Sequence, residues 1–145
     1  MPALIIGYGN DLRGDDAAGP RVAAAVAAWH LPGVAALGVG QLTPELAEPI
    51  AQARLVLFVD AGAVARLLVA PIRPAAHTSA LGHTGDPGAL LALAGAVYGA
   101  CPPAWLITVP AAHFELGRAL SPLAACGVAQ ATRSIHMLIR AGGRP

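Results

Sequence analysis

LIIGYGNDLRGDDAAG, residues 4–19 of the chain, connects a short apolar strand to a glycine-rich turn and then to the start of a helix. The turn carries two adjacent carboxylates, Asp15 and Asp16, to the point where the helix is predicted to begin. Neighbouring acids at the carboxyl end of a strand suit a cation, a proton or a water molecule better than a phosphate. The stretch therefore indicates metal-dependent or acid–base chemistry at one edge of a sheet.

The composition is typical of one small α/β domain rich in alanine. The 145 residues are enough to bury a single core, so we expect one domain over residues 1–145. The formal net charge is +1 and 12% of residues are charged, which excludes a broad electrostatic surface for nucleic acid or anionic lipid. Proline and glycine interrupt the two uncharged runs, residues 22–44 and 87–114, so we expect no membrane span.

The cellular setting is predicted from the first residues and from the cysteines. No basic segment precedes the first apolar run, so we expect no signal peptide. Cys101 and Cys126 form no Cys-x-x-Cys pair and are expected to be small core residues. Both observations favour a reducing cytoplasm.

Strand-like and helix-like segments alternate along the chain, which predicts a mostly parallel sheet covered by helices on both faces. The predicted strands are residues 4–6, 34–39, 55–59, 67–72 and 104–109. The predicted helices are residues 16–29, a helix that begins at 43–44, residues 87–98, and a last helix from 121–122 to about residue 140. Each of the last three begins with a capping residue followed by proline: Thr43, Asp86 and Ser121.

Three features fall at the carboxyl ends of the predicted strands, where ligands collect in open α/β sheets. They are the pair Asp15-Asp16, the residue Asp60 at the end of strand 55–59, and the loop that carries His77 and His83. Two carboxylates and an imidazole suit a divalent metal such as nickel, zinc or manganese, and equally suit acid–base work on a water molecule. Asp15 can be explained as a helix cap, which leaves Asp16 as the candidate functional acid.

Two other kinds of site fit the sequence poorly. A dinucleotide fingerprint needs its third glycine where this chain has Leu12, and the two aspartates would face the pyrophosphate. The serines at 79, 121 and 134 lack a nucleophile-elbow setting, and neither cysteine lies in a recognisable nucleophile context.

The motifs together resemble the maturation endopeptidases of nickel–iron hydrogenases, from residue 4 to about residue 135. The matching segments are residues 7–10, 14–16 and 19, the strand ending in Asp60-Ala61, His83 ahead of a helix, and residues 115–117 and 120–122. Residues 41–45 and 102–106 are most similar to the subgroup that serves soluble, NAD-linked bidirectional hydrogenases. Two differences stand out: Asp16 replaces the glutamate of many relatives, and residues 109–113 depart from the commoner pattern.

The resemblance implies a three-layer αβα sandwich with a mostly parallel, twisted sheet of about five strands. It implies removal of a C-terminal extension from a hydrogenase large-subunit precursor after nickel insertion. By motif position, the catalytic and metal-contacting residues are Asp16, Asp60 and His83. The expected metal is nickel carried by that precursor, with no organic cofactor, and the expected protein is a cytoplasmic monomer. A non-catalytic, metal-sensing chaperone of the immature large subunit is the alternative.

Overall fold

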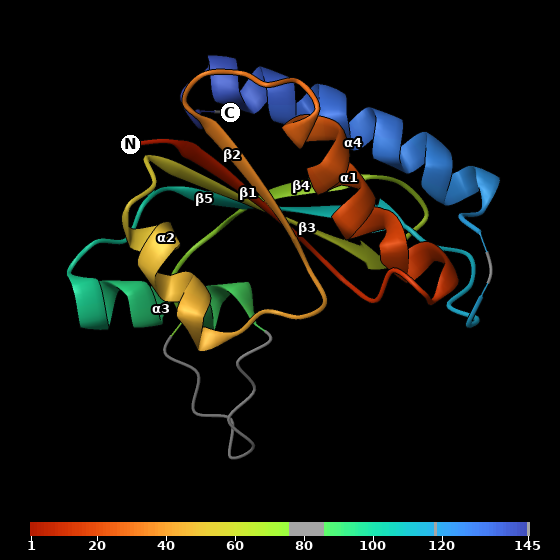
Figure 1. Cartoon of the computed structure of the whole chain (residues 1–145), viewed down its shortest axis with the longest axis horizontal. Helices are drawn as coiled ribbons and strands as arrows, with labels where there is room; N and C mark the ends of the chain where they lie inside the picture. Colours follow the sequence, from red (N-terminus) through yellow and green to blue (C-terminus); the bar gives the residue numbers. More distant parts are fainter. Residues whose placement is uncertain (76–85, 118, 145) are drawn as a thin grey trace.

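A five-stranded sheet lies between two layers of helices in the computed structural model, which describes residues 1–75, 86–117 and 119–144 (Figure 1). The strand order is β2-β1-β3-β5-β4. The pairs β1–β2, β1–β3 and β3–β5 are parallel, and β4 runs antiparallel to β5 at one edge. The strands are β1 (Ala3–Tyr8), β2 (Val34–Val39), β3 (Leu55–Gly62), β4 (Leu68–Ile72) and β5 (Ala104–Pro110).

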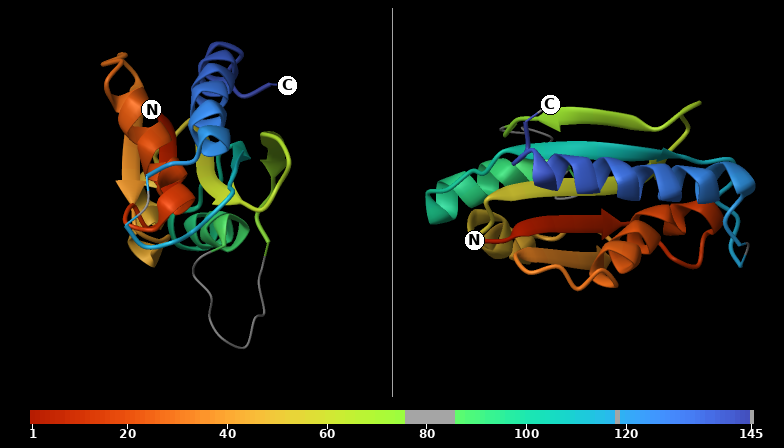
Figure 2. Two further views of the ribbon diagram at one scale, coloured as in Figure 1. Left: turned by 90° about the vertical axis from the view of Figure 1, so that its right-hand side faces the viewer. Right: turned by 90° about the horizontal axis from the view of Figure 1, so that it is seen from above.

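Helices α1 and α4 cover one face of the sheet, and helices α2 and α3 cover the other (Figures 1 and 2). They are α1 (Ala18–Ala27), α2 (Ala47–Ala51), α3 (Pro87–Tyr98) and α4 (Pro122–Arg140), with short 3-10 turns η1 (Gly14–Ala17) and η2 (Pro44–Leu46) before α1 and α2. This arrangement confirms the predicted three-layer αβα architecture. None of the helices in the described ranges combines the length and apolar character that crossing a membrane requires.

The predicted helix starts have different outcomes. The Asp86 side chain accepts a hydrogen bond from the Gly88 N–H at 2.9 Å, and the Ser121 hydroxyl accepts one from the Ala124 N–H at 3.1 Å. These two caps confirm the prediction. Thr43 and Pro44 lie at the start of a helical segment as predicted, but Thr43 makes no side-chain cap and the segment begins as the 3-10 turn η2, so only the predicted cap is wrong.

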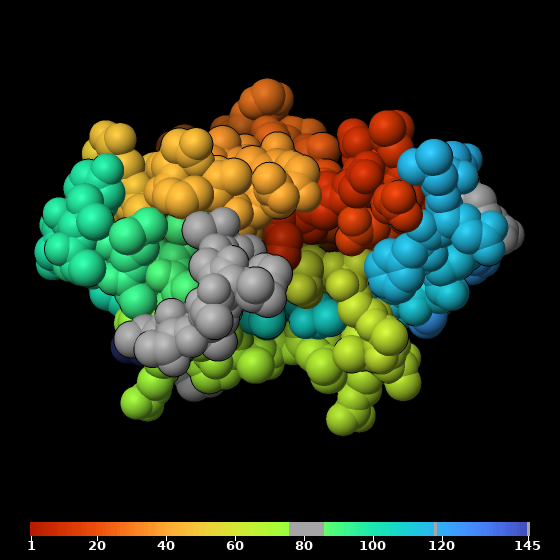
Figure 3. All heavy atoms as spheres, turned by 90° about the horizontal axis from the view of Figure 1, so that it is seen from below, coloured from red at the N-terminus to blue at the C-terminus, as the bar shows by residue number. Residues whose placement is uncertain are grey.

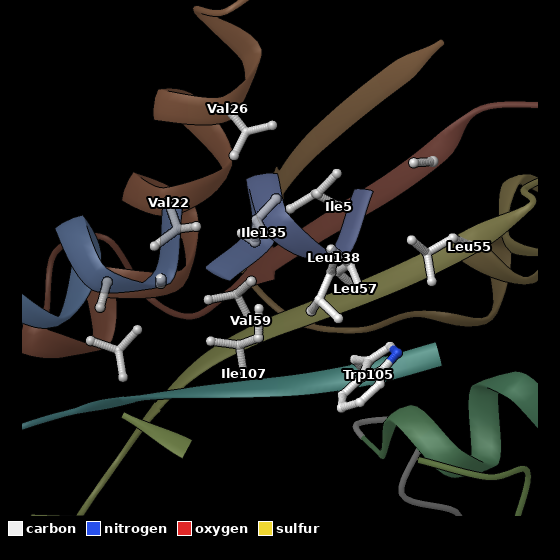
Figure 4. Packing of buried hydrophobic residues seen from close by; sticks show 14 residues of the cluster. Ile5, Val22, Val26, Leu55, Leu57, Val59, Trp105, Ile107, Ile135 and Leu138 are labelled. Atoms are coloured by element: carbon white, nitrogen blue, oxygen red, sulfur yellow. The ribbon is translucent and has the colours of Figure 1, made fainter. Parts of the chain in front are cut away.

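Strand alternation divides the core into two clusters, one on each face of the sheet. Leu55, Leu57 and Val59 point towards α1 and α4, where they pack with Ile5, Val22 and Ile135 (Figure 4). The intervening Val56 and Phe58 pack with residues of α2 and α3 on the other face. A strand buried on both sides reads as a continuous apolar run, which is why residues 55–59 are the clearest strand in the sequence.

Both cysteines are exposed, so the prediction that they are core residues is wrong. The buried positions of α4 are Ala124, Gly127, Ala131, Ile135 and Leu138, at helical spacing, and Cys126 lies off this stripe. Cys101 follows the end of α3 and precedes β5. Cysteine is small and weakly polar, which made burial plausible for both residues. Whether each one is buried depends instead on where it lies on its helix or loop.

Helix α1 begins directly above the carboxyl ends of β1 and β3 because Gly19 has no side chain. A Cβ atom at Gly19 would lie 2.5 Å from the carbonyl oxygen of Tyr8 and 2.6 Å from that of Val59. Such contacts are too short for real atoms, so any larger residue would push the helix away. The glycine therefore holds the acidic turn η1 close to the ends of the two central strands.

Candidate active site

The candidate site lies where β1 and β3 end side by side. In the sheet, β2 is the neighbour of β1 on one side and β3 is its neighbour on the other. The strand order therefore reverses between β1 and β3. In open α/β sheets such a switch point leaves a crevice outside the carboxyl ends of the strands, and ligands bind there. The geometry of the sheet thus selects the same edge that the sequence motifs indicate.

Tyr8 and Asp60 meet at this edge because of strand register. Gly7 of β1 pairs with Val59 of β3, so the next residues along the two strands are neighbours. Both continue the alternate positions that face α2 and α3. The Tyr8 hydroxyl donates a hydrogen bond to Oδ2 of Asp60 at 3.0 Å.

Asp60 is only half satisfied by the described part of the protein. Its Oδ1 atom is buried and has no hydrogen-bond partner among residues 1–75, 86–117 and 119–144. Burial raises the pKa of Asp60 and the nearby charge of Asp16 raises it further, while the hydroxyl groups of Tyr8 and Thr108 lower it. A buried carboxylate oxygen left in this state is suited to a cation, a proton or a polar substrate group.

Tyr8 remains a hydrogen-bond donor throughout the ordinary pH range. Burial is the main reason that the pKa of Tyr8 lies far above its usual value, and the negative charges of Asp60 and Asp86 raise it further. The effect of Asp86 also shows that the start of α3 lies near this edge. The sequence analysis did not select Tyr8. Its position two residues after Ile6 predicts that both side chains lie on the same face of the strand, which could have placed Tyr8 at this edge.

Asp16 lies on η1, in the turn that follows β1. Its Oδ2 atom accepts a hydrogen bond from the Asn10 N–H at 2.7 Å, which folds the turn back on itself. Gly9 has a φ of +147°, and a Cβ atom there would collide with the main-chain oxygen of Asp16. The motif glycine thus lets the turn close tightly, and the partly exposed Asp16 carboxylate stays within electrostatic reach of Asp60.

Asp15 has a different environment and is fully buried. Its Oδ2 accepts hydrogen bonds from the Ala112 N–H at 2.7 Å, the His113 N–H at 3.3 Å and the Ser121 hydroxyl at 2.7 Å. Its Oδ1 accepts one from the Ser121 N–H at 2.7 Å. The residue does not cap its own helix, as the sequence suggested, but ties the first turn to the segment between β5 and α4.

The hydrogen bonds to Asp15 also set its ionisation. Burial alone raises the pKa of a carboxyl group, but here the bonds from Ser121, Ala112 and His113 outweigh it and lower the pKa from 3.8 to about 2. A carboxylate that accepts several hydrogen bonds is strongly held in its charged form. Asp15 is therefore a structural anion with no oxygen to offer a ligand.

The two segments that Asp15 joins also meet through main-chain bonds. The Asp15 N–H donates to the carbonyl oxygen of His113 at 3.0 Å, and the Gly117 N–H donates to that of Leu12 at 2.7 Å. Figure 3 shows the atoms near the start of the chain beside those that follow β5. His113 was not predicted as part of this edge, and its buried Nδ1 has no hydrogen-bond partner within the described ranges.

His83 and His77 lie outside the described residues, so the third predicted site residue stays a prediction. Within the described part of the chain, no group of three or more His, Cys, Asp or Glu side chains could hold a metal ion together. The structure does bring Asp16 and Asp60 to one edge, where Tyr8 bonds to Asp60. A cavity of about 470 Å³ opens next to this edge, between the ends of β1 and β2, and Asn10 lines it.

The fold matches solved structures of hydrogenase maturation proteases. The hydrogenase maturating endopeptidase HybD from E. coli has a TM-score of 0.80 and 22% identity, over 99% of this chain and 94% of that chain. The NiFe hydrogenase maturation protease HycI from Thermococcus kodakarensis has a TM-score of 0.74 and 24% identity, over 96% of this chain and 92% of that one. The hydrogenase 2 maturation peptidase from a Thaumarchaeota archaeon has a TM-score of 0.72 and 22% identity, over 99% and 100%.

These similarities confirm the predicted fold over nearly the whole chain. No family model matches the sequence, and no curated protein matches it. At identities of 22% to 24%, a shared fold does not transfer chemistry by itself, because one fold can host several functions. The function must be argued from the site.

Proposed function

We propose that this protein is an endopeptidase that removes a C-terminal extension from the large-subunit precursor of a nickel–iron hydrogenase after nickel insertion. The observation that carries the proposal is the buried Oδ1 of Asp60 at the switch point, which has no hydrogen-bond partner among the described residues and lies within electrostatic reach of Asp16. The solved structures with this fold include proteins described as hydrogenase maturation proteases, which supports this choice of substrate. The proposal places the protein in the cytoplasm as a monomer without an organic cofactor.

Both acids contact the nickel in this proposal, and Asp16 has a second task. Asp60 presents Oδ1 to the nickel that the precursor carries, with Asp16 and His83 as the other contacts. Nickel at this position would hold the precursor and can polarise a carbonyl group. Asp16, which is partly exposed, accepts a proton from the attacking water as the water oxygen bonds to the scissile carbonyl carbon. The proton then passes to the leaving nitrogen as the peptide bond breaks.

The surface beside the acids suits a protein substrate. Leu12 is 65% exposed, Phe114 is 42% exposed and Leu116 is 68% exposed. Leu12 lies in the turn after β1, and Phe114 and Leu116 lie in the segment after β5. The two segments are in contact, because the Gly117 N–H donates a hydrogen bond to the carbonyl oxygen of Leu12. Exposed apolar side chains that gather in one area are typical of protein interaction sites. We therefore propose that the precursor rests on this apolar rim when its tail enters the site.

The experiment compares nickel-loaded with nickel-free precursor and follows cleavage by intact mass. We expect the wild-type protein to shorten only the loaded precursor, at a single peptide bond. Asp16→Asn and His83→Ala should fold normally and lose processing by at least about 100-fold. The controls are Glu48→Gln and His30→Asn, which change an exposed acid and an exposed histidine, and asparagine is used at position 30 because that residue has a φ of +50°.

Three results would count against the proposal. Equal cleavage of the nickel-free precursor would show that the protein does not need nickel to recognise its substrate. Full activity of Asp16→Asn or His83→Ala would remove that residue from the site. A precursor that is bound by the wild-type protein but keeps its mass would favour the chaperone alternative.

A further inference from the structure

The strongest unassigned feature of the site is the contact between Tyr8 and Asp60. The Tyr8 hydroxyl occupies Oδ2 of Asp60 at 3.0 Å, while Oδ1 of the same carboxylate is buried without a partner among the described residues. The two oxygens of one side chain are thus unequal. Oδ2 accepts a hydrogen bond from the protein, and Oδ1 is left for a partner that the described residues do not supply.

The position of the Tyr8 hydroxyl is well determined by the fold. Tyr8 is the last residue of β1, and its ring packs against the core cluster between the sheet and α2 and α3. The register of β1 against β3 fixes the height of the ring relative to Asp60. A side chain held by both its main chain and its ring can orient a neighbour precisely enough to matter for binding.

We propose that Tyr8 is a positioning residue that makes Asp60 a one-oxygen ligand. The Tyr8 hydroxyl competes with an ion for Oδ2 and leaves Oδ1 open, so Asp60 is set up to bind an ion through Oδ1 alone. A carboxylate can bind a cation with one or two oxygens, and each oxygen used fills a coordination position. The one-oxygen arrangement keeps a position open for the scissile carbonyl or for water, as catalytic metal sites require. This inference rests on the proposed function for the role of the ion.

The hydrogen bond from Tyr8 to Asp60 is of a kind with a known effect in metal sites. Groups that hydrogen-bond to a metal ligand orient it, and their removal typically costs about 10- to 100-fold in metal affinity or activity. Tyr8 occupies that place relative to Asp60.

The test is Tyr8→Phe, which deletes the hydroxyl and keeps the ring that fills the core. Tyr98→Phe is the matched control, because Tyr98 is the other tyrosine of the chain and is 50% exposed at the end of α3. Affinity for Ni²⁺ alone is measured by calorimetry on the full-length proteins, with Asp60→Asn as the reference for a lost ligand. Thermal unfolding of each variant checks that the fold is kept.

We expect Tyr8→Phe to bind Ni²⁺ about 10-fold more weakly than the wild type, Asp60→Asn to lose most binding and Tyr98→Phe to match the wild type. With precursor, Tyr8→Phe should lower kcat/KM about 10-fold and Tyr98→Phe should leave it unchanged, because the hydroxyl of Tyr8 orients the ligand that meets the nickel of the precursor. Wild-type Ni²⁺ affinity in Tyr8→Phe, or no binding of Ni²⁺ by the wild type, would overturn the role of Tyr8. The expected Ni²⁺ affinities with an uncleaved precursor would instead refute the proposed function and leave the role of Tyr8 standing.

Discussion

Asp15 and Asp60 lie at the same edge of the sheet, but their surroundings are opposite. Asp15 accepts four hydrogen bonds that cover both of its oxygens. Asp60 accepts a bond from Tyr8 on Oδ2 and is affected by the Thr108 hydroxyl, while its buried Oδ1 lacks a partner in the described part of the chain. The pKa of Asp15 is accordingly lowered to about 2, whereas that of Asp60 is raised.

This contrast separates a structural acid from a functional one. Burial disfavours charge at both residues, and the number of hydrogen bonds decides whether the protein compensates for it. Full compensation at Asp15 stabilises the fold and leaves nothing for a ligand. Incomplete compensation at Asp60 costs stability, and a cost of that kind at the carboxyl edge of a sheet is characteristic of functional sites.

The largest expected effect is on activity, at Asp60. Asp60→Asn keeps the shape but removes the anionic oxygen, so we expect precursor processing to fall at least about 100-fold. The free energy of unfolding should change by less than about 1 kcal/mol, because the change also removes a poorly compensated buried charge. Activity and urea unfolding measured on one preparation check both expectations. A loss of several kcal/mol would make Asp60 a structural acid like Asp15.

Asp15→Ala should act mainly on stability. It leaves the Ala112 and Ser121 N–H groups without their acceptor, so we expect a loss of about 3 kcal/mol in the free energy of unfolding. Urea unfolding followed by circular dichroism measures the loss, with Asp16→Ala as the neighbouring control at less than about 1 kcal/mol. Equal losses in the two variants would erase the distinction between these acids.

The acid sensitivity of the fold should follow Asp15. Its pKa is lowered from 3.8 to about 2, so its stabilising contribution is present above the unfolded value and is lost as the pH falls from about 4 towards 2. In Asp15→Ala this part of the pH dependence should be absent. Unfolding free energies of both proteins between pH 2 and about 6 test the expectation, and parallel curves would contradict it.

The smallest expected effect is at Ser121, which bonds to Asp15 and caps α4. Ser121→Ala removes the hydroxyl that donates to Asp15 and accepts from Ala124, so we expect a loss of about 1 kcal/mol. Ser134→Ala, on the same helix, is the control. In the double variant with Asp15→Ala the Ser121 effect should shrink, because one of its two bonds is already gone. Full additivity would show that the two side chains are not coupled.

The sequence predicts local features well and distant partners poorly. Residues 34–39 and 87–98 are correctly predicted because strand propensity, Asp86 and Pro87 act within a few residues. The partners of Asp15 are 97 to 106 residues away, so the sequence suggested a cap for its own helix instead. Asp16 and Asp60 were found from their places at predicted strand ends and from motif position, and the sheet order then confirms that the two strands end side by side. His83 stays a prediction.

The measurement that tests the central claim most directly is anomalous diffraction at the nickel edge from crystals of the protein soaked in Ni²⁺. The claim is that Asp16 and Asp60 share one pocket that meets a single ion. We expect one strong peak about 2.1 Å from Oδ1 of Asp60, on the side that faces Asp16, with Oδ2 still bonded to Tyr8. A nickel position away from both acids, at an exposed cysteine or histidine, would contradict the claim.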